Sequence, residues 1–245
     1  MIKSSKIPLI DINALYGTDT VAKQDVGRQI DAVCRKSGFF QITNHGAEEN
    51  LKNLTEKTFR FFKDLNFEQK IAMARKKHNP KSAHKYRGFF PATVNGKEGF
   101  DIGNPNILVA DDLAKLPLNE PTQWPNEIEL PGFREYFTNF YKLMTDLART
   151  LLKGFALALG KEENFFDDKV RYEDCMTTLR LNHYPFLSSI DAVEVASDGT
   201  RLGTETHKDS SLITILYQPI EGLQVEDNEE GWIDISPSET NLVIK

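Results

Sequence analysis

The sequence predicts an α+β fold in which a β-rich C-terminal part packs on helices. Two observations lead to this expectation. Between Ala22 and Leu159, apolar residues recur at helical spacing in several stretches, which is typical of helices that bury one face. After Gly160 the chain changes to short β-prone runs separated by turn signals. Closely spaced strands after a helical part are typical of a jelly roll or barrel packed on helices.

Length and composition indicate one sizeable domain. The chain has 245 residues, of which 40% are hydrophobic and 27% are charged. This is enough to bury one substantial core. We therefore expect a single domain over residues 1–245, mainly helical over 1–165 and β-rich over 166–245.

Charge and targeting signals restrict the partners and the location. A net charge of -6 argues against nucleic acid and anionic membranes, which need a concentrated positive surface, so we expect a small-molecule partner. Residues 1–6 lack the apolar stretch of a signal peptide, and the chain has no transmembrane-length apolar run. A cytoplasmic location is expected. Cys34 and Cys175 are then expected to be free thiols, with Cys34 buried in a helical stripe.

Short β-prone runs and helical stretches alternate in the N-terminal third. Asp19 and Thr20 are candidate N-caps of the first helix, and Gly38 suits its C-terminal stop. The expected elements are a strand over 6–12, a helix over 19–37, a strand over 39–42 and a helix over 51–65.

The remaining sequence predicts one long helix and several short strands. Residues 78–131 are rich in Gly, Pro and Asn, which favours irregular structure with only short extended pieces. A stripe of apolar and aromatic residues predicts a helix over 133–159 that ends at Gly160. The β-prone runs that follow are residues 176–184, 211–218, 223–225, 232–235 and 241–244.

His207 and Asp209 are candidate metal ligands. They lie two residues apart, directly before the β-prone run that begins at Ser211. Alternate residues of an extended segment point to the same side, so the imidazole and the carboxylate can share one metal ion. A histidine and a carboxylate, completed by a second histidine, form the facial triad of non-haem iron(II) oxygenases. The alternative is a surface histidine beside a solvated aspartate.

Asn182 and Tyr184 are candidate ligand-orienting residues. On the alternating run Leu179–Pro185 they face the same way. An amide and a phenol are neutral donors that can orient a carboxylate. Periodicity alone equally allows a half-buried strand with its polar edge in water.

Several stretches, taken together and in order, resemble landmarks of one family. The family is that of the iron(II)/2-oxoglutarate-dependent oxygenases related to isopenicillin N synthase. The resemblance implies a double-stranded β-helix (jelly-roll) core flanked by helices, in a single oxygenase domain. It also implies that iron(II) is held by His207, Asp209 and one further histidine. The stretches that carry it are residues 7–11, 37–46, 86–90, 179–185, 207–218 and 222–225.

The resemblance also implies roles for other residues. Asn182 and Tyr184 would orient the cosubstrate 2-oxoglutarate, and Arg87 and Phe89 would contact the small organic substrate that is oxidised with dioxygen. Arg87 is displaced by one position from the family's substrate-binding arginine. Two alternatives stay open: an oxidative cyclase of the isopenicillin N synthase type, which uses no oxoglutarate, and an inactive binding module.

In the family, the second histidine lies well downstream of the His-x-Asp pair. Here it would fall beyond Lys245, so we expect the jelly-roll core to be C-terminally incomplete in this chain. Two protein ligands do not fix an octahedral facial site. The 245-residue chain by itself is therefore expected to bind divalent metal weakly.

Overall fold

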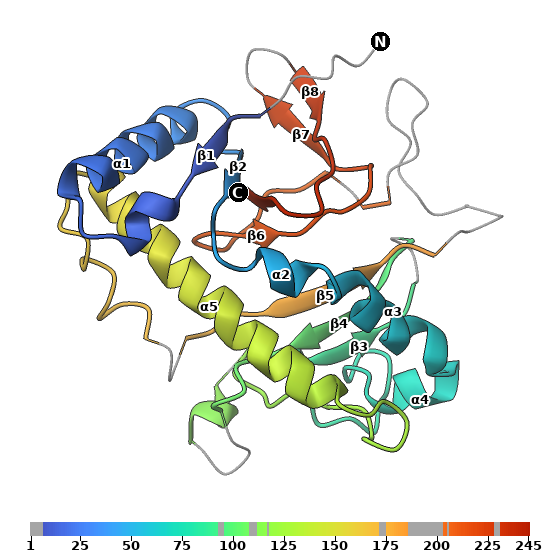
Figure 1. The fold of residues 1–245 in the computed structure, drawn as a ribbon. Helices are drawn as coiled ribbons and strands as arrows, with labels where there is room; N and C mark the ends of the chain where they lie inside the picture. Colours follow the sequence, from blue (N-terminus) through green and yellow to red (C-terminus); the bar gives the residue numbers. More distant parts are fainter. Residues whose placement is uncertain are drawn as a thin grey trace. The chain divides into compact units, whose positions relative to one another are not determined.

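The structure, a computed structural model, divides into two compact units (Figure 1). It describes residues 7–92, 96–107, 112–116, 118–171, 175–185, 203–204, 206–227 and 231–245. The first unit comprises Met1–Asn53, Lys142–Arg171 and Asp209–Lys245, and the second comprises Leu54–Tyr141 and Tyr172–Lys208.

Helices and strands occur in both units. The helices are η1 Asn13–Tyr16, α1 Thr20–Cys34, α2 Glu48–Leu51, α3 Leu54–Asp64, α4 Phe67–Ala72, η2 Asp112–Lys115 and α5 Phe133–Ala158. The strands are β1 Leu9–Asp11, β2 Phe40–Thr43, β3 Gly88–Phe90, β4 Glu98–Ile102, β5 Leu179–His183, β6 Ile215–Leu216, β7 Gln224–Asp227, β8 Gly231–Asp234 and β9 Leu242–Ile244.

The first unit is built on a four-stranded sheet of order β1-β2-β9-β6. β1 lies parallel to β2, whereas β9 pairs antiparallel with both β2 and β6. This pairing joins segments from the two ends of the chain, because Phe40 lies opposite Ile244. A hairpin of β7 and β8 contributes to a neighbouring apolar cluster that consists of Ile7, Val225, Ile233, Ile235 and Val243.

Helix α1 packs closely on the C-terminal part of α5 within the first unit. The carboxylate of Asp19 caps α1 by accepting from the backbone N–H groups of Val21 and Ala22. A Cβ atom added at Gly27 would lie 2.8 Å from the Cβ of Leu157. Real Cβ atoms do not approach so closely, so the absence of a side chain at Gly27 sets the distance between the helices.

We predict that Gly27→Ala destabilises the protein although alanine favours helices. The contacts around Gly27 are to the Cβ and backbone of Leu157, which cannot move without shifting the helix. Overpacking costs about 1–3 kcal/mol, against a helix-propensity gain of about 1 kcal/mol. Gly154→Ala is the matched control, because its nearest contact is the flexible tip of Ile30, and it should be closer to neutral. Chemical denaturation of both variants measures the difference; equal losses would contradict this account of the packing.

The second unit is built on an antiparallel three-stranded sheet of order β3-β4-β5. One face of the sheet is covered by aromatic side chains. Phe89 of β3 and Phe100 of β4 lie opposite each other, and Phe61 of α3 stacks on Phe100 with ring centroids 4.4 Å apart. Phe133, in the first turn of α5, completes this cluster. Aromatic burial on this scale is a large stabilising contribution to the unit.

The expected elements are found largely where the sequence placed them. The long helix is α5, and Gly160 follows it with a φ of 65°. The expected strand over 211–218 is shorter, because only β6 is paired. The buried thiol expected at Cys34 is wrong: Cys34 is the last residue of α1, beyond the buried stripe, and is exposed. Cys175 is buried, and neither cysteine forms a disulfide. In the described part of the chain no helix is long and apolar enough to cross a membrane.

Candidate active site

Asp209 is held in place by its neighbours in the first unit. Its Oδ2 accepts a hydrogen bond of 2.7 Å from the Thr214 hydroxyl, and its Oδ1 lies 3.0 Å from the Lys245 ammonium. Ser211 shares a 2.8 Å hydrogen bond with Thr214. His207 precedes Asp209 in an exposed segment outside the helices and strands. Hydroxyl and ammonium groups therefore fix the orientation of the carboxylate and balance its charge.

Both oxygens of the Asp209 carboxylate are engaged in this structure, so a cation bound there would displace the Lys245 ammonium from Oδ1. Metal-binding carboxylates are commonly oriented by an outer hydrogen bond, as the Thr214 hydroxyl provides here. Imidazole and carboxylate together match the ligand preference of iron(II). Among the residues that the structure describes, no three His, Cys, Asp or Glu side chains gather closely enough to hold a metal ion.

Asn182 lies in β5, and Tyr184 is the first residue after this strand. Leu181 is buried, whereas Asn182 and Tyr184 are both exposed. The Tyr184 side chain packs over Gly203, and its hydroxyl lies 3.3 Å from the Thr204 hydroxyl. With about half of its surface exposed, at 52%, Tyr184 leaves its phenol available to a ligand.

His183 faces the opposite side of the sheet. Its Nδ1 lies 2.8 Å from a Glu98 carboxylate oxygen, and Lys70 approaches the other oxygen of Glu98 at 3.0 Å. Its ring packs against Phe59 and Phe62. His183 is therefore engaged in the packing of β5 on α3 and is not available as a metal ligand beside Asn182.

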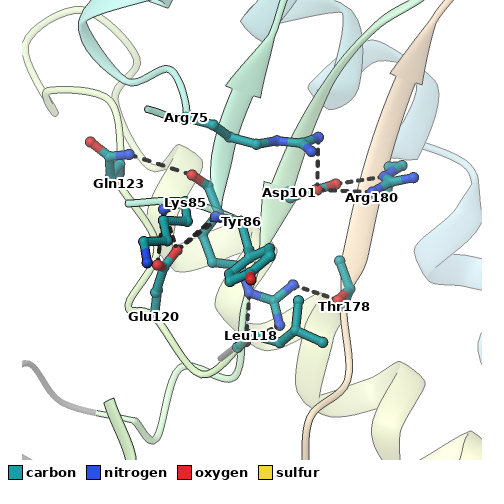
Figure 2. A network of polar contacts seen from close by, with 10 residues as sticks. Arg75, Lys85, Tyr86, Asp101, Leu118, Glu120, Gln123, Thr178 and Arg180 are labelled. Carbon is teal, nitrogen blue, oxygen red and sulfur yellow. Dashed lines mark hydrogen bonds and ion pairs between the residues drawn. The ribbon is translucent and has the colours of Figure 1, made fainter. Parts of the chain in front are cut away.

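Arg87 is a buried anchor that joins separate segments of the second unit. Only 2% of it is exposed, and its guanidinium donates to the Leu118 carbonyl, from Nε at 2.9 Å and also from Nη2. Nη1 donates to the Thr178 hydroxyl. Burial lowers the pKa of Arg87, while nearby acidic groups such as Asp101 oppose this effect. Figure 2 shows Leu118 and Thr178 at one end of this polar network.

Glu120 ties down the segment that leads into β3 (Figure 2). Its carboxylate accepts from the backbone N–H groups of Lys85, Tyr86 and Arg87. Partial burial alone would raise the pKa of Glu120, but these three hydrogen bonds to the charged form lower it. The segment therefore has a fixed course before the strand begins.

Phe89 belongs to the aromatic cluster and is fully buried. Arg87 and Phe89 were both expected to contact substrate. Their positions do not support that role, because the Arg87 donors are engaged within the protein and the Phe89 ring lies in the core. Phe90, the next residue, points to the opposite face of β3 by strand alternation.

That opposite face carries a charged group that the sequence pattern did not reveal. Asp101 of β4 lies 2.6 and 2.9 Å from two guanidinium nitrogens of Arg180, and 3.0 Å from Nη2 of Arg75 (Figure 2). Arg180 precedes Asn182 by two residues, so the alternation that grouped Asn182 with Tyr184 also places Arg180 on their face. Arg75 could not be found this way, because it lies outside the strands.

Comparison with known proteins defines the class. Residues 7–127 match the family model described as non-haem dioxygenase in morphine synthesis N-terminal, and residues 175–245 match that of the 2OG-Fe(II) oxygenase superfamily. The chain belongs to the isopenicillin N synthase-like family of iron(II)/2-oxoglutarate-dependent oxygenases.

The similar relatives and structures agree with this class. The chain is 36% identical to isopenicillin N synthase of Flavobacterium sp., covering 100% of this chain and 76% of the relative. The isopenicillin N synthase of Penicillium chrysogenum is 37% identical, over 98% and 74% of the two chains. Among solved structures, a full-length Neurospora crassa protein in complex with alpha-KG and 5-formyluracil matches with a TM-score of 0.76 and 26% identity, over 98% and 71%.

These similarities confirm the predicted fold class. The structural neighbours are 2OG-Fe(II) oxygenases with a jelly-roll core, and the present structure combines helices and sheets accordingly. The family consists of iron(II)-using oxidoreductases that act on small molecules with dioxygen.

Proposed function

We propose that the protein is an iron(II) oxygenase that couples oxidative decarboxylation of 2-oxoglutarate to oxidation of a small organic substrate, by hydroxylation or a related reaction. The observation that supports oxoglutarate use is the exposure of Asn182 in β5 and of Tyr184, the first residue after this strand. An amide and a phenol two residues apart suit the orientation of a carboxylate.

His207 and Asp209 would hold the iron, with a further histidine as the third ligand. When bound, iron(II) supplies the redox chemistry by which dioxygen becomes reactive. The contribution of the Thr214 hydroxyl is to keep the Asp209 carboxylate turned toward one position. Lys245 lies on the other carboxylate oxygen, and a bound cation would take the place of its ammonium there.

Asn182 and Tyr184 would hold the cosubstrate while it loses carbon dioxide. In the overall reaction, oxoglutarate and dioxygen give succinate and carbon dioxide; one oxygen atom enters succinate and the other serves the oxidation of the substrate. The two side chains bind and orient; neither has to move a proton.

A second candidate is an oxidative cyclase of the isopenicillin N synthase type, without oxoglutarate. The observation in its favour is the 36% and 37% identity to isopenicillin N synthases over nearly the whole chain, which exceeds the 26% identity to the Neurospora crassa protein solved with alpha-KG. Under this alternative Tyr184 would contact the oxidised substrate itself.

Tyr184→Phe separates these alternatives. If the phenol donates to a cosubstrate carboxylate, its loss removes a charge-assisted hydrogen bond of about 1.5–3 kcal/mol, so oxoglutarate should bind roughly ten- to a hundredfold more weakly. The affinity for iron(II) should stay unchanged. Anaerobic titration of the full-length protein with oxoglutarate gives both values.

Tyr86→Phe is the matched control, because Tyr86 is also an exposed tyrosine of the second unit. It should leave oxoglutarate binding at the wild-type level. Undiminished oxoglutarate affinity in Tyr184→Phe would argue against the proposed role of Tyr184.

A further inference from the structure

We infer that His183 is a positioning residue for the cosubstrate, because its hydrogen bond to Glu98 fixes the end of β5. His183 stands between Asn182 and Tyr184 in the sequence, and it acts on oxoglutarate only through these two neighbours. The inference deepens the proposed function and rests on it, since it takes Asn182 and Tyr184 as the residues that orient oxoglutarate.

Strand pairing brings His183 to Glu98. His183 is the last residue of β5 and lies opposite Glu98, the first residue of β4. Opposite residues of an antiparallel pair point to the same face of the sheet, so their side chains can meet. Nδ1 of His183 lies 2.8 Å from Oε1 of Glu98. Because an ionised carboxylate can only accept, we place the hydrogen of this bond on Nδ1.

Lys70 engages the other oxygen of Glu98. Its Nζ lies 3.0 Å from Oε2 and also donates to the Phe62 carbonyl at 3.3 Å. Lys70 and Glu98 are both buried, and a buried carboxylate is unfavourable unless donors satisfy its oxygens. Each oxygen of Glu98 therefore has its own donor, and the carboxylate cannot turn without losing one of them. We call Lys70, Glu98 and His183 the polar trio.

The imidazole ring of His183 is also held by aromatic side chains of α3. The ring centroid of Phe59 lies 5.4 Å away in an edge-on arrangement, and that of Phe62 lies 5.0 Å away. Such distances are typical of packed aromatic pairs. The His183 side chain is 25% exposed. Ring packing and the hydrogen bond from Nδ1 together leave the imidazole one orientation.

The neighbours of His183 have no comparable support from the core. Asn182 points to the other face of β5 by alternation and is exposed, and Tyr184 is 52% exposed. The β4-β5 pairing ends at the pair of Glu98 and His183, where a strand frays unless other contacts hold it. The placement of the amide and the phenol therefore depends on the backbone that His183 anchors.

Stability alone does not require polar groups at this place. Replacement of a buried ionic group by apolar side chains of similar volume is often neutral for stability. The polar trio provides direction, because hydrogen bonds are strong only over a narrow range of distances and angles. This direction is imposed directly beside the two residues that we assign to oxoglutarate.

Two substitutions at position 183 separate the hydrogen bond from the ring packing. His183→Phe keeps an aromatic ring beside Phe59 and Phe62 but removes the Nδ1–H donor, whereas His183→Asn keeps a donor close to the backbone and removes the ring. Anaerobic titration of the full-length, iron-loaded protein measures oxoglutarate binding. His183→Phe should weaken it about five- to tenfold, and His183→Asn should stay within about twofold of the wild type. Iron(II) affinity should not change in either variant.

A third variant tests the same bond from its other end. Lys70→Met/Glu98→Met replaces the buried ion pair with apolar side chains and leaves His183 without its acceptor. Such replacements commonly preserve the fold, so this variant serves also if His183→Phe does not fold. It should weaken oxoglutarate binding by about as much as His183→Phe.

A positioning role further predicts coupling between His183 and Tyr184. In the Tyr184→Phe background, His183→Phe should weaken oxoglutarate binding by less than about threefold, because the hydrogen bond that it would misplace is already absent. An effect that does not pass through Tyr184 would give the same factor in both backgrounds.

His78→Phe is the matched control, because His78 is a histidine of the second unit outside the helices and strands; it should leave oxoglutarate binding unchanged. Wild-type oxoglutarate affinity in His183→Phe overturns the inference, and so do equal losses in His183→Phe and His183→Asn or equal factors in the two backgrounds. If Tyr184→Phe weakens binding while His183→Phe does not, the inference fails and the proposed function stands. A wild-type protein that binds no oxoglutarate overturns both.

Discussion

Replacement of Asp209 by asparagine is expected to abolish measurable oxidation in the full-length protein. Loss of an outer-shell partner of a metal ligand already costs about 10–100-fold in metal affinity or activity, and loss of the ligand's own charge should cost more. Asparagine keeps the size of the side chain and an oxygen that can accept from the Thr214 hydroxyl. The fold should therefore be preserved while iron(II) binding falls at least about a hundredfold.

Iron(II) titration and succinate release measure the two effects of Asp209→Asn. Glu221→Gln is the control, because Glu221 is an exposed carboxylate of the same part of the chain and is expected to have no metal role. An Asp209→Asn variant with wild-type iron affinity would remove Asp209 from the ligand set.

Arg87→Met is expected to lower the free energy of unfolding by about 3 kcal/mol. The substitution removes hydrogen bonds to the Leu118 carbonyl and the Thr178 hydroxyl. Hydrogen bonds from a charged donor contribute about 1.5–3 kcal/mol each, and buried acceptors left without a donor add to the cost. Methionine retains much of the apolar stem, so the loss reports mainly on the guanidinium.

Chemical denaturation of Arg87→Met should be compared with Arg35→Met. Arg35 is a highly exposed arginine that pairs with Asp31 one helical turn earlier, and such exposed pairs contribute little to stability. A stability loss confined to Arg87→Met supports its role as a buried anchor. If Arg87→Met kept the stability of the wild type but lost substrate affinity, the result would support the substrate contact that the sequence predicted for Arg87.

The sequence predicted those elements whose burial pattern is one-sided. Helix α5 was expected over 133–159 and runs Phe133–Ala158, because one face of it is apolar and the other polar. Strand β4 escaped prediction because all five of its residues are buried, which removes the alternation that marks a strand. Helix α4 was not predicted: it is only six residues long, and the structure shows that Asn66 and Gln69 form a capping box at its start.

The sequence argument for the site depends on local spacing. It grouped Asn182 and Tyr184 by alternation along residues 179–185, and the structure places Asn182 in β5 and Tyr184 directly after it. The same argument includes Arg180, which was overlooked because only neutral donors were sought. Arg75 depends on the bridge between Ala74 and Phe89, a contact across chain segments that no local pattern reveals. Likewise, the engagement of the Arg87 guanidinium by Leu118 depends on a distant loop of the chain.

The most direct test of the central claim is oxoglutarate consumption by the full-length protein. Iron(II)-loaded enzyme is incubated with dioxygen, with and without oxoglutarate, and oxygen uptake is measured together with succinate release. We predict that both require oxoglutarate, that they occur in equal amounts, and that Tyr184→Phe raises the oxoglutarate concentration needed. Oxygen uptake that is coupled to a substrate but indifferent to oxoglutarate would contradict the account and favour the oxidative cyclase.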